Sequence, residues 1–212
     1  MLRRRPGEQF DVGLIDGPRG KATLVEVGEK DLQLSFAWGE PPPALAPLRL
    51  ILGRPRPQTA RDLLREGTAL GVAAMDFVRT KRAEAGYGQS SLWTAGEWRQ
   101  FLLDGAAQAF CTRLPAVQHG HTLQAAIAAA PAACTRLALD NYEASTALAE
   151  LVLPGSPGVV LALGAERGWS DEEREQLRQN GFQFVHLGPR VLRMETACIA
   201  AVTLVKAKRG WA

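Results

Sequence analysis

Three apolar segments in the second half of the chain have the pattern of buried strands, and each is followed by sequence of helical character. They are "RLALD" (136–140), "GVVLALG" (158–164) and "FQFVHLG" (182–188). Short, nearly continuous apolar runs are typical of parallel strands that helices cover on both faces. Because such strands alternate with helices here, the pattern predicts an α/β domain with a mostly parallel sheet.

The same alternation begins further upstream. The segments "LRLILG" (48–53) and "AAMDFV" (73–78) are predicted strands, and residues 59–71 between them have a helical pattern. Thr59 is the predicted N-cap of this helix, because it precedes the helical pattern and Asp62 follows three residues later. The α/β domain is therefore expected to cover residues 48–212.

The N-terminal part has a different pattern. Short alternating segments between glycine and aspartate turn signals fill residues 10–36 and predict a small β-rich module. Pro41, Pro42 and Pro43 follow, and proline continues neither a strand ladder nor a helix. We expect a β-rich module over residues 1–40 and a stiff linker over 41–47.

Composition limits the class of protein and its location. The net charge is only +3, which is weakly compatible with nucleic acid. Cys111, Cys134 and Cys198 are too far apart for a zinc or redox motif. The N-terminus lacks the apolar core of a signal peptide, and the longest apolar stretch, 197–205, is about half a membrane span. These features predict a cytoplasmic protein.

The loop after residues 158–163 has the marks of a ligand site. It runs from Gly164 to Trp169, and Ser170 is predicted to cap the next helix in a capping box with Glu173. Ligands in open α/β sheets bind at the carboxyl ends of strands. Neither a G-x-G-x-x-G fingerprint nor a P-loop is present, which disfavours a Rossmann-type enzyme. A simple tight turn is the alternative.

Two segments resemble the signatures of one family. Residues 164–170, "GAERGWS", are similar to its "GPEGGF/W-S" loop, and residues 187–197, "LGPRVLRMETA", to its "LG-x-R-I-L-R-x-E-T-A" segment. The family is the SPOUT-class methyltransferases of RsmE type, which methylate ring nitrogen 3 of a uridine in 16S ribosomal RNA of the small subunit. The resemblance implies a SPOUT domain with a deep trefoil knot, a PUA-like RNA-binding module before it, and a homodimer formed through the apolar C-terminal helix.

The resemblance also implies a cofactor, S-adenosylmethionine (SAM), held by three loops. Backbone groups would bind the adenine, which is consistent with glycine and aliphatic residues at these positions. The residues implied to bind the cofactor are Leu139, Leu163, Gly164, Glu166, Gly168, Leu187, Gly188, Val191, Leu192 and Thr196.

The reaction needs a group that helps the uridine imide lose its proton or stabilises the anion that forms. Arg190 and Arg193 are the expected electrostatic partners, and Glu195 the expected orienting group or proton acceptor. The alternative is that Arg193 and Glu195 form a buried network that only shapes the fold.

The positions that the family resemblance implies would face RNA match the family less well than the cofactor segments do. Arg82 is kept, and Arg3, Arg4 and Arg5 are expected to contact phosphates if the protein binds RNA. Because the family's pattern starts earlier, the module is expected to be truncated and to lack a first strand. Glu66, Ala69 and Cys111 depart from the family, and these departures favour the alternative of a non-enzymatic RNA-binding or ribosome-assembly protein.

Two further features of the sequence concern backbone strain and metal binding. Arg167 replaces a family glycine, and a β-carbon there would cost roughly 1–2 kcal/mol if the position needed a positive φ. His119 and His121 stand in "QHGH" with no cysteine or acidic residue close in sequence. We interpret this segment as a surface loop and expect no metal.

Overall fold

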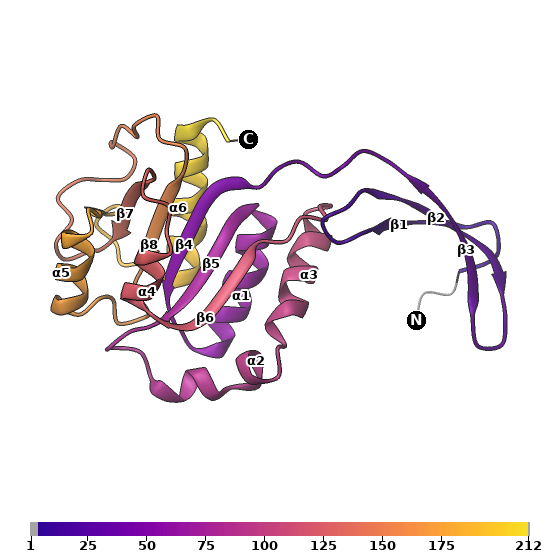
Figure 1. Ribbon diagram of the computed structural model, residues 1–212, viewed down its shortest axis with the longest axis horizontal. Helices are drawn as coiled ribbons and strands as arrows, with labels where there is room; N and C mark the ends of the chain where they lie inside the picture. Colours follow the sequence, from indigo (N-terminus) through magenta and orange to yellow (C-terminus); the bar gives the residue numbers. More distant parts are fainter. Residues whose placement is uncertain (1–3, 212) are drawn as a thin grey trace.

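The computed structural model describes residues 4–211. Figure 1 shows a small antiparallel sheet on one side and a larger α/β part on the other, joined by an extended segment. The small sheet contains β1 (Gln9–Gly13), β2 (Arg19–Val27) and β3 (Leu32–Trp38) in that order. The extended segment, residues 39–45, carries no helix or strand, as three consecutive prolines require.

The small sheet has few buried side chains. Ala22 and Leu24 are buried, whereas Phe36 and Trp38 on the same face are about half exposed and stack with ring centroids 5.2 Å apart. The turn between β1 and β2 contacts the α/β part, where the Asp16 amide donates to the Thr112 carbonyl at 2.8 Å. The module is therefore attached both by the linker and by this turn.

The larger sheet has six strands in the order β6-β5-β4-β8-β7-β9, and all of its pairs are parallel. The predicted parallel α/β domain is confirmed. β4 lies in the middle because the chain returns to it with β8 after building β5 and β6 on its other side. The strands are β4 (Ala46–Gly53), β5 (Val72–Arg79), β6 (Ala116–Thr122), β7 (Thr135–Leu139), β8 (Val159–Leu163) and β9 (Gln183–Val185).

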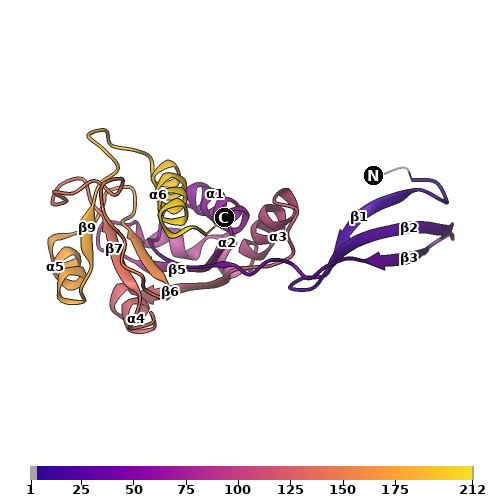
Figure 2. The same cartoon turned by 90° about the horizontal axis from the view of Figure 1, so that it is seen from above.

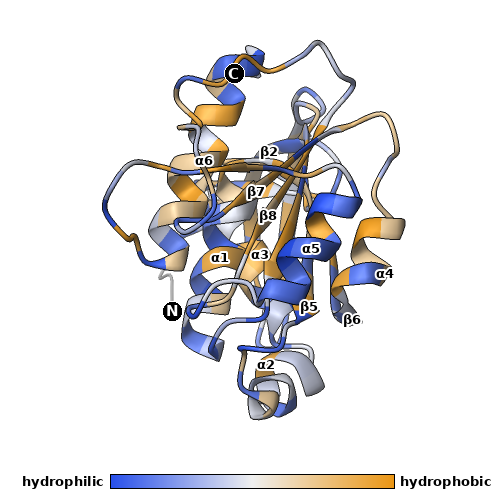
Figure 3. Cartoon of the chain, turned by 90° about the vertical axis from the view of Figure 1, so that its left-hand side faces the viewer, coloured by the Kyte–Doolittle hydropathy of each residue, from blue (hydrophilic) through white to orange (hydrophobic). Residues whose placement is uncertain are grey.

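Helices cover both faces of this sheet, as Figure 2 shows. One face packs against α1 (Pro57–Ala69), α3 (Trp98–Gln108) and α6 (Met194–Arg209), and the other against α4 (Leu123–Ala128) and α5 (Asp171–Gln179). In Figure 3 most of α5 has the colour of hydrophilic residues. A short 3₁₀ helix, η1 (Ala85–Gln89), and α2 (Ser91–Thr94) follow β5. None of the helices in residues 4–211 is long and apolar enough to cross a membrane.

Local predictions have mixed outcomes. The capping box is confirmed, since Ser170 Oγ accepts from the Glu173 amide at 3.2 Å and Glu173 Oε2 from the Ser170 amide at 2.8 Å. The N-cap prediction for Thr59 is wrong: α1 begins at Pro57, whose fixed φ suits the first turn, and Thr59 is buried inside the helix. The surface-loop interpretation of His119 and His121 is also wrong, because both lie in β6.

Candidate cofactor and active site

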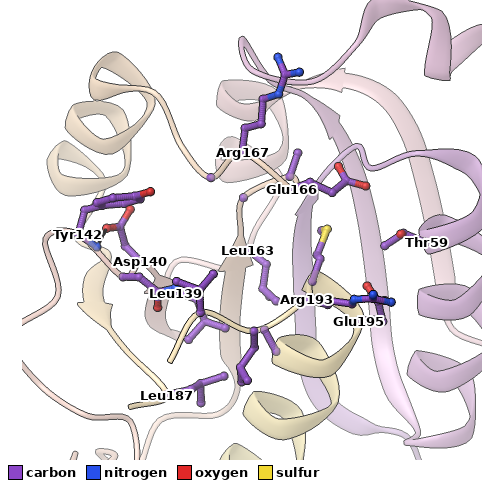
Figure 4. A pocket seen from close by; sticks show the side chains of 18 of the residues that line it. Thr59, Leu139, Asp140, Tyr142, Leu163, Glu166, Arg167, Leu187, Arg193 and Glu195 are labelled. Atoms are coloured by element: carbon purple, nitrogen blue, oxygen red, sulfur yellow. Dashed lines mark hydrogen bonds between the residues drawn. The ribbon is translucent and has the colours of Figure 1, made fainter. Parts of the chain in front are cut away.

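A cavity of about 570 Å³ lies at the carboxyl ends of β7 and β8. Three loops form most of it, residues 139–142, 163–168 and 187–193, together with the first turns of α1 and α6. Figure 4 shows the side chains around it. The loops come from three separate regions of the sequence, and the parallel sheet brings their ends to one edge.

The loop after β8 is held in a compact shape by its glycines. A β-carbon on Gly164 would lie 2.8 Å from the Gly168 backbone, so only glycine permits this close approach. Gly168 has a φ of +67°, and its amide donates to the Ala165 carbonyl at 2.7 Å. Arg167 is not among the positive-φ residues of the described chain, so it carries none of the expected backbone strain.

Glu166 and Arg82 connect the loop after β8 to its neighbours. Glu166 Oε1 accepts a hydrogen bond from the Arg56 amide at 3.0 Å, which ties the loop to the start of α1. Arg82 Nη1 donates to the Arg167 carbonyl at 3.2 Å. In Figure 4 the Arg167 side chain extends away from Leu163 and the other labelled residues deep in the cavity. The Arg167 side chain therefore points away from the deep part of the cavity.

The loop after β7 is fixed by Asp140, which is buried. Its Oδ1 accepts from the amides of Tyr142 and Glu143 at 2.7 and 2.9 Å, and its Oδ2 accepts from Arg174 Nε at 2.8 Å. Sequence analysis placed only Leu139 here and missed Asp140, Asn141 and Tyr142, which also line the cavity. An aspartate directly after a buried strand is an Asx-turn signal that could have identified them.

The third loop precedes α6 and carries the predicted catalytic residues. Arg190 and Arg193 are exposed, and Glu195 is half-buried in the first turn of α6. None of the ion pairs within residues 4–211 includes these three side chains. The alternative of a buried Arg193–Glu195 network is therefore wrong, and all three side chains are free to meet a ligand in the cavity they line.

Most predicted cofactor residues line this cavity, namely Leu139, Leu163, Gly164, Glu166, Gly168, Leu187, Val191 and Leu192. Gly188 and Thr196 are not among the lining residues: Gly188 turns the third loop with a φ of +111°, and Thr196 is exposed on α6. Sequence analysis missed further lining residues, which are Arg56, Thr59, Ala165, Arg167, Met194 and Ala197.

The predicted RNA-binding arginines do not form one group. Arg4 and Arg5 are exposed in the N-terminal part, on the other side of the molecule from the α/β part in Figure 1. Arg82 lies beside the loop after β8. Arg3 lies outside the described residues.

Comparison with known proteins defines the class. The RNA methyltransferase domain family matches residues 42–206, and the chain belongs to this family. Ribosomal RNA small subunit methyltransferase E of Treponema pallidum is 33% identical over 98% of the chain and 80% of that relative. The protein of the same name from a Synechocystis strain is 28% identical over 98% of the chain and 68% of that relative.

Solved structures have the same fold. A structure described as a methyltransferase of Legionella pneumophila with the bound cofactor SAM has a TM-score of 0.82 and 26% identity, covering 97% of this chain and 85% of that one. The SAM-bound ribosomal RNA small subunit methyltransferase E of Neisseria gonorrhoeae has a TM-score of 0.81 at 24% identity, with the same coverage.

Proposed function

We propose that this protein is a SAM-dependent methyltransferase that methylates ring nitrogen 3 of a uridine in 16S ribosomal RNA of the small subunit. The observation that carries the proposal is the convergence of three loops on one cavity, with Arg190, Arg193 and Glu195 at its wall and in no ion pair within residues 4–211. The names of the relatives support the substrate, and the SAM-bound neighbours support the cofactor.

The residues present fit SAM. The cavity volume, about 570 Å³, lies within the range of small-molecule sites, roughly 300–1,000 Å³. Backbone groups of Leu163, Gly164 and Leu187 would hold the adenine, since a side chain on Gly164 would fill the turn. The Glu166 carboxylate, at the cavity wall, favours a ligand whose sulfonium is positive.

The chain's own residues then supply what the acceptor needs. When bound, SAM provides a methyl group that is already activated. The imide nitrogen of uridine must lose its proton, and negative charge develops on the base. Arg190 and Arg193 stabilise that charge, while Glu195 orients the base or accepts the proton. Arg4, Arg5 and Arg82, with Arg3 outside the described residues, contact RNA phosphates.

We also infer the larger organisation that the family resemblance implies. Residues 1–40 form a PUA-like module, residues 41–47 a linker and residues 48–212 a knotted SPOUT domain. A homodimer through α6 is consistent with Ile199, which is 37% exposed on that helix, and with Val191 and Leu192 nearby, 81% and 37% exposed. A ribosomal RNA substrate places the reaction in the cytoplasm.

One pair of measurements tests the proposal. Isothermal titration with SAM should show micromolar binding with about one site per chain. Incubation with labelled SAM and small-subunit ribosomal RNA should then place the methyl group on uridine N3, detected by mass spectrometry of the nucleosides. SAM binding without transfer to this RNA would contradict the assigned substrate. A folded protein that binds RNA but no SAM would favour the non-enzymatic alternative.

A further inference from the structure

Arg54 is a buried cation whose Nε has no hydrogen-bond partner among the described residues. It follows β4, and its amide donates to the Val78 carbonyl at 2.8 Å, which extends the parallel ladder by one residue. The residue is only 8% exposed, and its Nε is buried with no hydrogen-bond partner in the described chain. Burying an unpaired guanidinium is costly, so a side chain kept in this state calls for a function.

The groups around Arg54 are also basic. A β-carbon on Gly120, between His119 and His121, would lie 3.6 Å from Arg54 Nη2, and the Arg99 guanidinium lies 4.4 Å from the ring centroid of Trp98, which flanks His119. Burial and the nearby Arg79 lower the pKa of Arg54, and burial together with Arg54, His121 and Arg99 lowers the pKa of His119. None of the ion pairs within residues 4–211 includes Arg54, Arg79 or Arg99. We call these five residues, Arg54, Arg79, Arg99, His119 and His121, the basic cluster.

Asp76, an acidic residue beside this cluster, is already engaged. Asp76 on β5 interacts with His121, but both of its carboxylate oxygens accept from Arg49, at 2.6 and 2.9 Å. Its negative charge is therefore balanced by a cation outside the cluster. The cluster concentrates positive charge at the carboxyl ends of β4, β5 and β6, and no ion pair among the described residues neutralises its arginines, which is the electrostatic condition for binding an anion.

Neutral donors and flat surfaces lie in the same region. Thr80 Oγ1 and Trp93 Nε1 are buried without hydrogen-bond partners in the described chain. The rings of Trp93 and Trp98 flank His119, with centroids 5.0 and 6.2 Å from its ring. Gly88 lies directly against the Arg54 guanidinium, since a β-carbon there would overlap Nη1. Hydrogen-bond donors of side chains and the backbone of Gly88 therefore lie in the same region as Arg54.

The basic cluster adjoins the candidate active site. Arg56, two residues after Arg54, lines the cavity, and a β-carbon on Gly53 would lie 2.5 Å from the Ala165 amide of the loop after β8. The end of β4 is therefore shared between the two sites. A nucleotide whose base entered the cavity would have its neighbouring phosphates along this edge. Guanidinium groups suit phosphate because they donate two parallel hydrogen bonds.

We infer that the basic cluster, with Arg54 at its centre, binds a backbone phosphate of the RNA substrate next to the target nucleotide. This inference rests on the proposed function, because that function supplies the RNA. It assigns a positioning role to His119 and His121 of "QHGH" and to Arg54, none of which belongs to the two family signatures. The unpaired Arg54 is maintained at a cost to the free protein, and the bound phosphate offsets that cost.

The test compares Arg54→Met with Arg54→Lys and with a control outside the basic cluster, Arg65→Met on α1, whose guanidinium is already paired with Asp62. Affinity for in vitro transcribed 16S ribosomal RNA is measured at several salt concentrations, with SAM affinity and Tm measured in parallel. Arg54→Met should weaken RNA binding about tenfold or more and lower the salt slope by about one. Its SAM affinity should be unchanged, and its Tm unchanged or raised. Arg54→Lys should keep the slope and lose less affinity.

Each other outcome overturns the inference. RNA affinity equal to that of wild type and of Arg65→Met would mean that no phosphate contacts Arg54. A joint fall of RNA affinity, SAM affinity and Tm would mean that Arg54 supports the fold. Measurements on the wild-type protein distinguish a failure of the phosphate site from a failure of the proposed function. If the wild-type protein binds the RNA but transfers no methyl group, the methyltransferase assignment fails, and the RNA-binding comparison still tests the phosphate site.

Discussion

Arg174 on α5 and Asp140 after β7 form a buried ion pair, with Arg174 Nε 2.8 Å from Asp140 Oδ2 and side chains only 5% and 2% exposed. The same carboxylate accepts two backbone amides of the loop that lines the cavity. The pair therefore links a helix on one face of the sheet to the conformation of a cofactor loop. Arg174 also contacts Asp171 and Glu143, but their side chains are 87% and 37% exposed, so removing Asp140 takes away the only buried counterion of Arg174 in the described chain.

Asp140→Asn should accordingly lower the free energy of unfolding by about 3 kcal/mol, since the buried Arg174 guanidinium then keeps only the more exposed carboxylates of Asp171 and Glu143. The measurement is denaturant unfolding at neutral pH. Glu143→Gln is the matched control, because Glu143 is 37% exposed, and it should cost less than about 1 kcal/mol. The double variant Asp140→Asn, Arg174→Met should recover part of the loss. Equal costs for Asp140→Asn and Glu143→Gln would contradict this role of the pair.

The sequence predicts the strands of the sheet much better than the side-chain contacts between residues that are far apart in the sequence. Continuous apolar runs such as residues 158–163 identify buried parallel strands, and their ends locate the cavity. The Asp140–Arg174 pair spans 34 residues, and no local pattern fixes such a contact. "QHGH" was misassigned because a strand with polar side chains lacks apolar alternation. Arg54 is buried because η1 and β6 pack around it. The residues near position 54 in the sequence do not predict this packing.

Gly164→Ala should abolish most SAM binding, because its β-carbon would lie 2.8 Å from the Gly168 backbone and force the loop open. Overpacking of this kind costs about 1–3 kcal/mol. Gly168→Ala is the comparison: its β-carbon has open space, but the φ of +67° is strained for alanine, at roughly 1–2 kcal/mol of stability. Isothermal titration should therefore show the larger loss of SAM affinity for Gly164→Ala, and the reverse order would contradict the close packing of this loop.

Burial, together with Arg54, His121 and Arg99, lowers the pKa of His119 below its usual 6.5. Arg54→Met removes one of these cations, so the His119 pKa should rise, which an NMR pH titration of the imidazole resonances would measure. Because the pKa is lower in the native protein, the unfolded chain binds a proton at His119 more readily than the native chain does. Neutral His119 therefore contributes to stability above the pKa of the unfolded chain, and this contribution is lost as the pH falls to the pKa of the native protein. An unchanged His119 pKa in Arg54→Met would contradict the proximity of the two groups.

Cys198 on α6 should resist thiol reagents in the native protein. Its complete burial disfavours the thiolate and raises the pKa to about 12, so almost no reactive thiolate forms at pH 8. Cys111 and Cys134 are half-buried and should react first. Labelling with a maleimide followed by peptide mass spectrometry distinguishes the three. Labelling of Cys198 as fast as the other two, in a protein that stays folded, would contradict this packing of α6.

Arg193→Gln and Glu195→Gln should lower kcat for RNA methylation by about 100-fold or more, because each removes a group that acts on the developing charge or proton of the uridine. SAM affinity should change only a few-fold, since both side chains sit at the cavity wall without partners that shape the loops. Glu175→Gln on α5 is the control and should keep wild-type activity. Single-turnover methyl transfer with saturating SAM separates the chemical step from binding. Full activity of both variants would leave Arg190 as the remaining candidate and refute the roles assigned to Arg193 and Glu195.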